Sequence, residues 1–352
     1  MTTENWEISS DQITFEDFEG IQTLSISGGG EATLKNRSFY KGTIEFDFMV
    51  TGRSFCGIYF RRQEGENRTP TFHSEFYYLR AFKMDDPLVS GAVQYAPITR
   101  GTNLWDMLHD YEGNANIKGT GWNKIKLVIS EKQMKCYLNG DLVLWIPELM
   151  SVDQPGKITL EGLGRYANFK ITPDLHPGLP STVGADVTQH DPRYIRDWEF
   201  SNEAEFERTA TFGSLPFPDS TTQWTPITAQ RFGLINLTKE ISSPFTENTR
   251  KVIWLRTTIE SSSSQLKKLN IGFSDDIFVF INGRLLNVDM NTYNQPIAKN
   301  PNGRLHIDNS TINLPLQEGS NELMIAVAND FFGWGLVARL SDMIGITGKM
   351  IH

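Results

Sequence analysis

The chain has 352 residues, of which 39% are hydrophobic and 11% aromatic, and its formal net charge is −9 at pH 7. This length suffices for two domains that each bury a core, and the composition excludes a disordered or fibrous protein. The negative charge argues against nucleic acid or an anionic membrane as main partner, because phosphate-binding surfaces are usually basic. No stretch approaches the roughly 20 apolar residues of a membrane-spanning helix, so we expect no membrane insertion.

The N-terminal stretch MTTENWEISS has neither the basic start nor the apolar core of a secretory signal peptide. If this start is native, we expect a cytoplasmic protein, whereas a removed leader would make the protein periplasmic or secreted. Only two cysteines occur, Cys56 and Cys136. A secreted module built on disulfides normally has more, so we predict that both are buried thiols.

Short strands separated by turns are predicted over residues 1–172. The stretch TIEFDFMV (43–50) alternates apolar and polar side chains, as a half-buried strand does. GIYFRRQ (57–63) and KIKLVI (124–129) alternate in the same way, and Asn139-Gly140 suits the tight turn of a hairpin. Such strands, spaced by roughly ten residues, favour a β-sandwich or jelly roll.

The rest of the chain is predicted to form a linker and a second β-sandwich. Residues 173–192 contain four prolines and show no periodicity, which is typical of a linker. Residues 193–352 again contain strand patterns, including the hairpin IFVFINGRLL (277–286) with Asn282-Gly283 at its turn. Both faces of the first strand of this hairpin are apolar, so we expect it to be central in its sheet. The fold class is therefore all-β, with two β-sandwich domains.

Polar and aromatic residues between positions 55 and 111 form the strongest candidate site. Tyr78 and Arg80 share one parity of their strand, and Arg61 shares one with Tyr59, so each pair should project together. Arginine offers a planar fork of donors for hydroxyl or carboxylate oxygens, and aromatic rings offer flat faces to a sugar ring. A structural Arg–Glu pair or a subunit interface would explain the same pattern. The candidate ligand-binding residues are Arg61, Glu75, Tyr78, Arg80, Gln94, Tyr95 and Trp105.

Several motifs of the first region occur in a characteristic order. They are GTIEFD (42–47), GIYFR (57–61), EFYYLR (75–80), QYAP (94–97), Trp105, the strand 122–129 and the hairpin 137–140. This set resembles the concanavalin A-like, laminin-G-like jelly rolls, and within them bacterial domains related to the 3-keto-disaccharide hydrolase family. The resemblance implies a jelly roll and a carbohydrate-related role, and many such relatives are binding modules.

The second region resembles another jelly roll through residues 276–286, 319–327 and 334–340. This is the galactose-binding-like domain that accompanies family 2 glycoside hydrolases. Sandwiches of that kind often hold a structural calcium ion, which prefers hard oxygen ligands. The candidate ligands are Asp275, Asp276 and Asp308, although turn-forming aspartates explain them equally, and we predict no other cofactor.

The candidate catalytic groups for glycoside cleavage are Glu45, Asp47, Glu75 and His109. Glu45 and Asp47 are two apart on a strand, which places them on one face roughly 7 Å apart. Family 16-type glucanases, which share the jelly roll, carry E-x-D-x-x-E on such a strand, but Val50 stands where the third acid belongs. Solvated carboxylates and an exposed loop histidine are the alternative interpretation.

These patterns predict a carbohydrate-associated protein that binds a saccharide or related polyhydroxylated ligand without cleaving it. Glycoside cleavage by a jelly-roll enzyme is the first alternative. The second is a structural or interaction protein whose polar-aromatic face packs against a partner.

Overall fold

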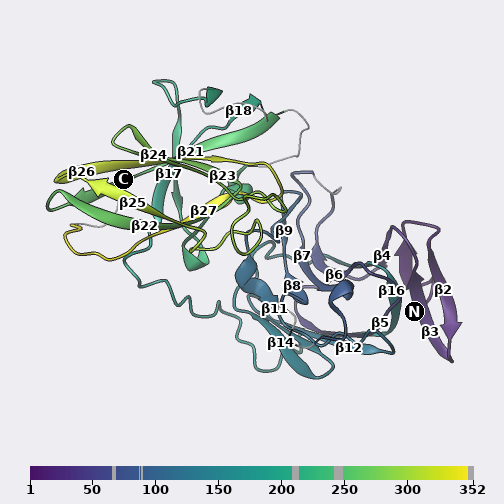
Figure 1. The fold of residues 1–352 in the computed structure, drawn as a ribbon. Coiled ribbons are helices and arrows are strands. Elements are labelled where there is room, and N and C mark those ends of the chain that lie inside the picture. Colours follow the sequence, from purple (N-terminus) through teal and green to yellow (C-terminus); the bar gives the residue numbers. More distant parts are fainter. Residues whose placement is uncertain (66–68, 87, 89, 208–213, 242–248, 348–352) are drawn as a thin grey trace. The chain divides into compact units, whose positions relative to one another are not determined.

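The computed structural model describes residues 1–65, 69–86, 88, 90–207, 214–241 and 249–347 (Figure 1). The chain divides into two compact units. The first unit comprises Met1–Asn103 and Asp110–Ala185, and the second comprises Leu104–His109 together with Asp186–His352. The hexapeptide Leu104–His109 therefore belongs to the second unit, although the segments on both sides of it belong to the first.

Strands dominate both units, which confirms the predicted all-β fold class. The helical segments in the described ranges are single turns: η1 (Ala81–Lys83), η2 (His109–Tyr111), η4 (Arg231–Gly233) and α1 (Leu237–Glu240). None of the helices in this part of the chain is long and apolar enough to cross a membrane.

Two seven-stranded antiparallel sheets make up most of the first unit, and Figure 1 shows them as two layers. The strands of sheet A are, in order, β1 (Trp6–Ile8), β4 (Glu31–Leu34), β15 (Lys157–Glu161), β6 (Phe55–Arg62), β7 (Glu75–Arg80), β8 (Val93–Tyr95) and β11 (Glu112–Gly113). The strands of sheet B are β14 (Asp141–Ile146), β13 (Met134–Leu138), β12 (Asn123–Ile129), β5 (Gly42–Val50), β16 (Gly164–Pro173), β3 (Ile21–Ile26) and β2 (Ile13–Phe18). A ribbon of β9 (Ile98–Thr99) and β10 (Thr102–Asn103) accompanies them.

Strand alternation explains which side chains form the core of the first unit. In β5, Ile44, Phe46 and Phe48 are buried, as the alternation of TIEFDFMV predicts. Phe46 and Phe48 line one common interior with Ile58 and Tyr77 of sheet A. The residues of opposite parity in β6 and β7 must therefore point to the outer face of sheet A.

The alternation of β6 breaks at its C-terminal end. Arg61 has a φ of 50°, and the pairing of β15 with β6 shifts register between Lys157 and Thr159. An extra residue in one strand moves every later side chain to the opposite face. Arg62, instead of Arg61, consequently lies over the ring of Tyr59, 5.4 Å from its centroid.

The predicted linker is attached to the first unit over most of its length. The hydroxyl of Thr43 donates to the carbonyl of Leu175 at 2.5 Å, and that of Ser130 donates to Pro180 at 2.8 Å. The amide of Gly184 donates to the carbonyl of Pro147 at 2.8 Å. These hydrogen bonds take the place of regular sheet pairing, which the prolines of the linker prevent.

The second unit is also built from two antiparallel sheets. The strands of sheet C are β19 (Trp224–Thr228), β17 (Asp197–Ser201), β21 (Thr249–Ser261), β26 (Gly319–Ala328), β23 (Asp276–Ile281) and β24 (Arg284–Met290), with β18 (Ala204–Glu207) also paired to β21. The strands of sheet D are β20 (Leu234–Asn236), β27 (Gly335–Leu340), β22 (Gln265–Ser274) and β25 (Ser310–Leu316).

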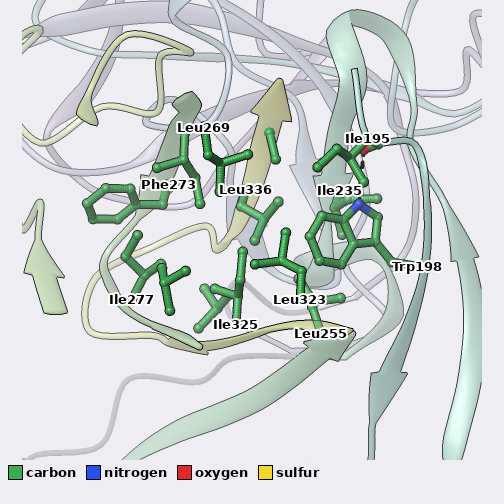
Figure 2. Close-up of a cluster of buried hydrophobic side chains, with 14 of the residues drawn as sticks. Ile195, Trp198, Ile235, Leu255, Leu269, Phe273, Ile277, Leu323, Ile325 and Leu336 are labelled. Atoms are coloured by element: carbon green, nitrogen blue, oxygen red, sulfur yellow. Dashed lines mark hydrogen bonds between the residues drawn. The ribbon is translucent and has the colours of Figure 1, made fainter. Parts of the chain in front are cut away.

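Side chains of both sheets meet in the core of the second unit (Figure 2). Trp198, Leu255 and Ile325 of sheet C and Leu269 and Phe273 of sheet D are all buried in it. The strand β23 is paired on both sides and its six residues are buried, which confirms that it is central. Its turn has positive φ at Asn282 (49°) and Gly283 (73°), as a type I′ hairpin requires.

Candidate functional site

An aromatic row crosses the outer face of sheet A. Tyr59 and Phe76 are cross-strand neighbours, and their rings stack with centroids 4.2 Å apart. Tyr78 continues the row, stacked on Phe76 at 5.3 Å, and Phe55 meets Tyr78 edge-on at 5.5 Å. The three stacked rings are almost buried, whereas 53% of the surface of Phe55 is exposed.

A polar network adjoins the row at Tyr78. The hydroxyl of Tyr78 donates to Oε1 of Gln94 at 2.5 Å, and the guanidinium of Arg80 donates to both groups. Arg80 also forms an ion pair with Glu112 at 2.7 Å, in which both side chains are nearly buried. The structure thus brings together Tyr78 and Arg80, as predicted from parity, places the candidate residue Gln94 beside them, and adds Glu112, which the sequence analysis missed.

An acidic cluster adjoins the row at Tyr59. Glu161 of β15 lies directly opposite Glu31 of β4. The carboxylate of Glu31 forms an ion pair with the guanidinium of Arg62, with Oε2 and Nη1 2.6 Å apart. Burial and the charge of Glu31 raise the pKa of Glu161, a hydrogen bond from Tyr59 and the charge of Arg62 lower it, and the net result is a pKa of about 7. A carboxyl that titrates near neutral pH both donates and accepts protons under physiological conditions.

The acidic cluster also remains accessible to solvent, and the sequence analysis did not predict it. The side chains of Glu31 and Arg62 are 21% and 14% exposed. Alternation of KITLE does place Glu161 beside Thr159 on one face. Nothing local indicates that β15 pairs with β4, because 126 residues separate Thr33 from its hydrogen-bonded partner Thr159.

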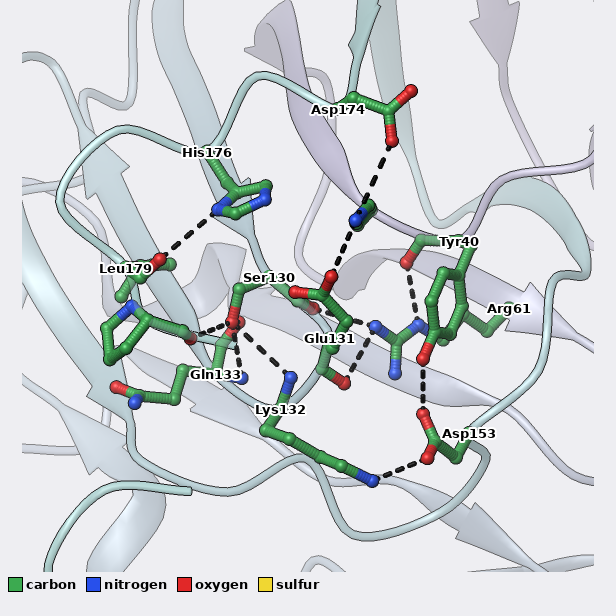
Figure 3. A network of polar contacts seen from close by, with 12 residues as sticks. Tyr40, Arg61, Ser130, Glu131, Lys132, Gln133, Asp153, Asp174, His176 and Leu179 are labelled. Carbon is green, nitrogen blue, oxygen red and sulfur yellow. Dashed lines mark hydrogen bonds and ion pairs between the residues drawn. The ribbon is translucent and has the colours of Figure 1, made fainter. Parts of the chain in front are cut away.

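Arg61 lies elsewhere, in a buried network at the end of the sandwich (Figure 3). Its guanidinium donates to the carbonyls of Tyr40, Ser130, Glu131 and Val152 at 2.8–3.1 Å. The ring of Tyr40 covers the guanidinium at 4.4 Å. The expectation that Arg61 projects with Tyr59 is corrected here, because the positive φ at Arg61 turns the side chain inward.

Glu75 and Tyr95 form a second buried pair, on the inner side of sheet A. The hydroxyl of Tyr95 donates to Oε2 of Glu75 at 2.5 Å. The backbone amides of Ser151 and Val152 donate to Oε1 of Glu75 at 3.2 and 3.0 Å. Burial raises the pKa of Glu75 despite these donors. The side chain is fully buried, so its role in the structure is to hold the loop at 151–152.

Trp105 and His109 belong to the hexapeptide Leu104–His109 of the second unit. The ring of Trp105 packs edge-on against Tyr293 at 4.8 Å, and the guanidinium of Arg304 lies 5.4 Å from its centroid. The imidazole of His109 meets that of His306 at 5.9 Å. Both residues therefore have neighbours in the second unit that the sequence order conceals.

Glu45 and Asp47 lie on the outer face of sheet B, away from the aromatic row. The carboxylate of Glu45 is 4.0 Å from the ammonium of Lys170, and Asp47 accepts a hydrogen bond from Asn168 at 2.7 Å. Glu45 is 40% exposed. This arrangement matches the alternative of solvated carboxylates that pair with neighbouring strands.

The predicted calcium ligands do not converge. Asp275 accepts hydrogen bonds from the backbone amides of Asp330 and Phe331, and Asp276 is paired with Arg250. Asp308 is 61% exposed and lies near Arg339. Among the described residues, no three His, Cys, Asp or Glu side chains form a group that could hold a metal ion.

A separate hollow opens at the edge of the first unit, with a volume of about 360 Å³. Trp6 and Phe169, in edge contact at 4.9 Å, form its apolar part. Asn5, Lys35 and Arg37 contribute polar groups. It shares no residue with the outer face of sheet A described above.

Residues 1–172 match the family model of the 3-keto-alpha-glucoside-1,2-lyase-like domain. This match confirms the resemblance to the 3-keto-disaccharide hydrolase family that their motifs indicated. A search of curated protein sequences found no match to the chain.

Solved structures similar to this chain cover about half of it. The carbohydrate-binding module CBM66 from Bacillus subtilis is 16% identical with a TM-score of 0.36, over 47% of this chain and 93% of that one. A β-1,3-1,4-glucanase (lichenase) from a mouse hindgut metagenome is 14% identical with a TM-score of 0.34, over 48% and 92%. The Bacillus licheniformis β-glucanase is 14% identical with a TM-score of 0.32, over 51% and 88%.

Proposed function

We propose that the first unit, which matches the model of the 3-keto-alpha-glucoside-1,2-lyase-like domain over residues 1–172, binds a saccharide on the outer face of sheet A. The observation that carries the proposal is the accessible cluster of Glu31, Arg62 and Glu161 beside the ring of Tyr59. Sugar hydroxyls need both donors and acceptors. Arg62 supplies donors, Glu31 supplies acceptors, and Glu161 supplies either according to its protonation.

The aromatic row supports the same ligand class. Sugar rings expose C–H groups that pack against aromatic side chains, and Phe55 is the ring of the row that solvent reaches most. Next to it, Tyr78 is fixed by Gln94 and Arg80, so the row is rigid. A rigid site loses little conformational entropy when a ligand binds.

A glycan array followed by calorimetric titration of its hits tests this proposal. Arg62→Ala and Glu161→Gln are expected to weaken binding at least tenfold, which corresponds to about 1.4 kcal/mol. Lys170→Ala, on the outer face of sheet B, is the matched control and leaves the affinity unchanged. Absence of any array hit, or wild-type affinity in both variants of sheet A, contradicts the proposal. A loss confined to Arg37→Ala would move the site to the hollow at the edge of the unit.

The pKa of Glu161 favours a second candidate, cleavage of a 3-keto-glucoside. A ketone at C3 acidifies the proton at C2, so a base can remove it while the bond from C1 to the leaving oxygen breaks. The electron pair of the C2–H bond forms the C1–C2 double bond, and the leaving oxygen takes up a proton. Glu161, with a pKa of about 7, suits the role of that base.

Two chromogenic compounds separate binding from cleavage. Release of nitrophenol from 4-nitrophenyl 3-keto-α-glucoside, but not from 4-nitrophenyl α-glucoside, indicates elimination that depends on the ketone. Release from both indicates ordinary glycoside hydrolysis. If neither compound reacts while a glycan still binds, the first unit is a binding module. Glu161→Gln abolishes the elimination if Glu161 is the base, whereas Glu45→Gln leaves it unchanged.

A further inference from the structure

The hexapeptide Leu104–His109 is held inside the second unit by apolar contacts. Leu104 and Met107 are at most 3% exposed, and Met107 lies against Gly333 and Gly335. The side chain of Asp106 enters the same interior and is 1% exposed. A buried carboxyl has to be neutral, paired with a cation or fully hydrogen-bonded.

Two backbone amides of other segments donate hydrogen bonds to Asp106, one to its carbonyl and one to its carboxyl. Its carbonyl accepts a hydrogen bond from the amide of Leu305 at 2.8 Å. Its Oδ1 accepts one from the amide of Gly333 at 3.3 Å. Its Oδ2 lies 3.2 Å from the hydroxyl oxygen of Ser274. The hexapeptide is thereby tied to three separate segments of the second unit.

The hydroxyl of Ser274 has two carboxyl neighbours but only one proton. Its oxygen lies 3.2 Å from Oδ2 of Asp106 and 3.0 Å from Oδ1 of Asp275. A hydroxyl donates one hydrogen bond, so the second contact is a hydrogen bond only if a carboxyl supplies the proton. Without that proton, two oxygen atoms with lone pairs would face each other in a buried place.

The other hydrogen bonds of Asp106 and Asp275 indicate which of the two carboxyls carries the additional proton. Oδ2 of Asp275 accepts hydrogen bonds from the backbone amides of Asp330 and Phe331 at 2.5 and 2.6 Å. Two such donors favour the ionised form of Asp275. The carboxyl of Asp106 accepts hydrogen bonds from its own backbone amide and, at 3.3 Å, from that of Gly333, which is longer than either amide bond to Asp275. The two short amide bonds to Asp275 thus favour an order of donation from Asp106 to Ser274 and from Ser274 to Asp275.

We propose that Asp106 is a neutral carboxylic acid in the folded protein, and that its proton holds the hexapeptide Leu104–His109 in the second unit until rising pH removes it. The hexapeptide runs through η2 into β11, which carries Glu112 of the candidate site. Loss of the proton would thus loosen the chain just before that strand.

The charged groups around the pair act on both carboxyls, so the hydrogen bonds to Asp275 carry the assignment. Burial and the charge of Asp276 raise the pKa of Asp275, whereas the amide of Phe331, the hydroxyl of Ser274 and the charge of Arg250, which is bonded to Asp276, lower it. Arg304 lies over Trp105, and the imidazoles of His109 and His306 are in contact. No cation is bonded to Asp106 itself in the described contacts.

Burial, and next the charge of Asp275, raise the pKa of Asp106 well above its ordinary value. A raised pKa means that the folded state binds the proton more tightly than the unfolded state. The stabilisation is therefore complete below the ordinary pKa of aspartate and is lost as the pH rises through the pKa of the folded state.

Hydrogen exchange of the full-length chain at several pH values tests the proposal. The informative amides are those of Leu305 and Gly333, which donate to Asp106. After correction for intrinsic exchange rates, the opening constant is expected to rise by up to tenfold per pH unit over the titration of one proton. Asp106→Asn places an amide donor where the acid proton was, so its opening constant is expected to stay independent of pH.

Two further variants make the outcome decisive. Asp106→Ala loses all the side-chain bonds and is expected to open more than wild type at every pH. Asp308→Asn removes one exposed carboxylate of the same unit and keeps the wild-type pH profile. If Asp106→Asn opens as readily as Asp106→Ala, or follows the wild-type profile, Asp106 acts as an anion and the proposal is wrong. Protection that rises with added calcium in wild type but not in Asp106→Asn would replace it by a cation site.

Discussion

Glu161 lies opposite Glu31 in the register of β15 and β4, so two carboxyls share one partly buried place on the outer face of sheet A. Burial together with the charge of Glu31 keeps the pKa of Glu161 at about 7, while Arg62 neutralises Glu31. One residue is thereby left able to gain or lose a proton near neutral pH, beside an aromatic ring. This pair is the basis of the proposed function and of the first prediction.

Glu161→Gln is expected to make the protein more stable above neutral pH. The raised pKa means that the protonated form is favoured by folding, so wild-type stability is lost as the pH rises from about 4.5 through about 7. Glutamine keeps the shape of the protonated acid and has no charge to bury. Urea denaturation at about pH 8 should show a gain on the order of 3 kcal/mol, since the pKa is raised from 4.5 to about 7 and one pKa unit is about 1.4 kcal/mol. At about pH 4 the two proteins should be equally stable.

Glu45→Gln is the control for this measurement, because Glu45 is 40% exposed on sheet B. It should leave the pH dependence of wild type intact. A pH profile of Glu161→Gln that runs parallel to wild type would show that Glu161 is ionised in the folded protein at all the pH values tested.

Arg61→Met is expected to destabilise the protein by about 3 kcal/mol or more. It leaves one buried and three partly buried carbonyls without this donor, and each buried unsatisfied group costs about 1–3 kcal/mol. Arg62→Met should cost only about 1 kcal/mol, because its ion pair with Glu31 is partly exposed. Urea denaturation gives both values, and equal costs would argue against the different environments of the two arginines.

Glycan affinity is expected to show the opposite order. Arg62→Met should weaken binding, while Arg61→Met should leave binding intact as long as the protein is folded. Calorimetric titration below the unfolding transition makes this comparison.

Glu112→Met is expected to cost about 3–5 kcal/mol, because it leaves the buried cation of Arg80 without its carboxylate. Adding Arg80→Met should recover part of this loss, since no buried charge then remains. The coupling free energy from the double-mutant cycle in urea measures the effect. Additive losses would mean that the two charges do not depend on each other.

Cys56 and Cys136 are expected to be inert in the native protein. Both thiols are buried and unpaired, and burial raises the pKa of Cys56 to about 11 and that of Cys136 well above its ordinary value. The thiolate is the reactive form, so 5,5′-dithiobis(2-nitrobenzoate) at about pH 8 should label neither thiol until urea is added. Rapid labelling of the folded protein would contradict the burial of these residues.

Strand alternation made much of the fold predictable, because it depends only on the geometry within one strand. It correctly placed Phe46 and Phe48 in the core of the first unit. The two Asn-Gly turns were predictable for a similar reason, since the positive φ values of a type I′ turn favour these residues. The joint projection of Tyr78 and Arg80 likewise followed from their spacing.

The candidate site was only partly predictable. Alternation failed at Arg61, where one residue with positive φ exchanged the environments of Arg61 and Arg62. Tyr95 follows Gln94 in the same strand and therefore points to the opposite face. It packs inside the sandwich with Glu75, whose carboxylate accepts its hydroxyl. Trp105 seemed to belong to the candidate face because of its place in the sequence, but the hexapeptide around it belongs to the second unit.

The sequence by itself thus determined the strands, their buried faces, the hairpin turns and the all-β class, because these depend on short-range geometry and local hydrophobic pattern. Only the tertiary structure decided that Glu161 pairs with Glu31, that Glu112 completes the network of Arg80, and that Asp106 meets Ser274. These contacts join segments from 32 to 168 residues apart. Such partners are chosen by the packing of whole sheets, which no local pattern records.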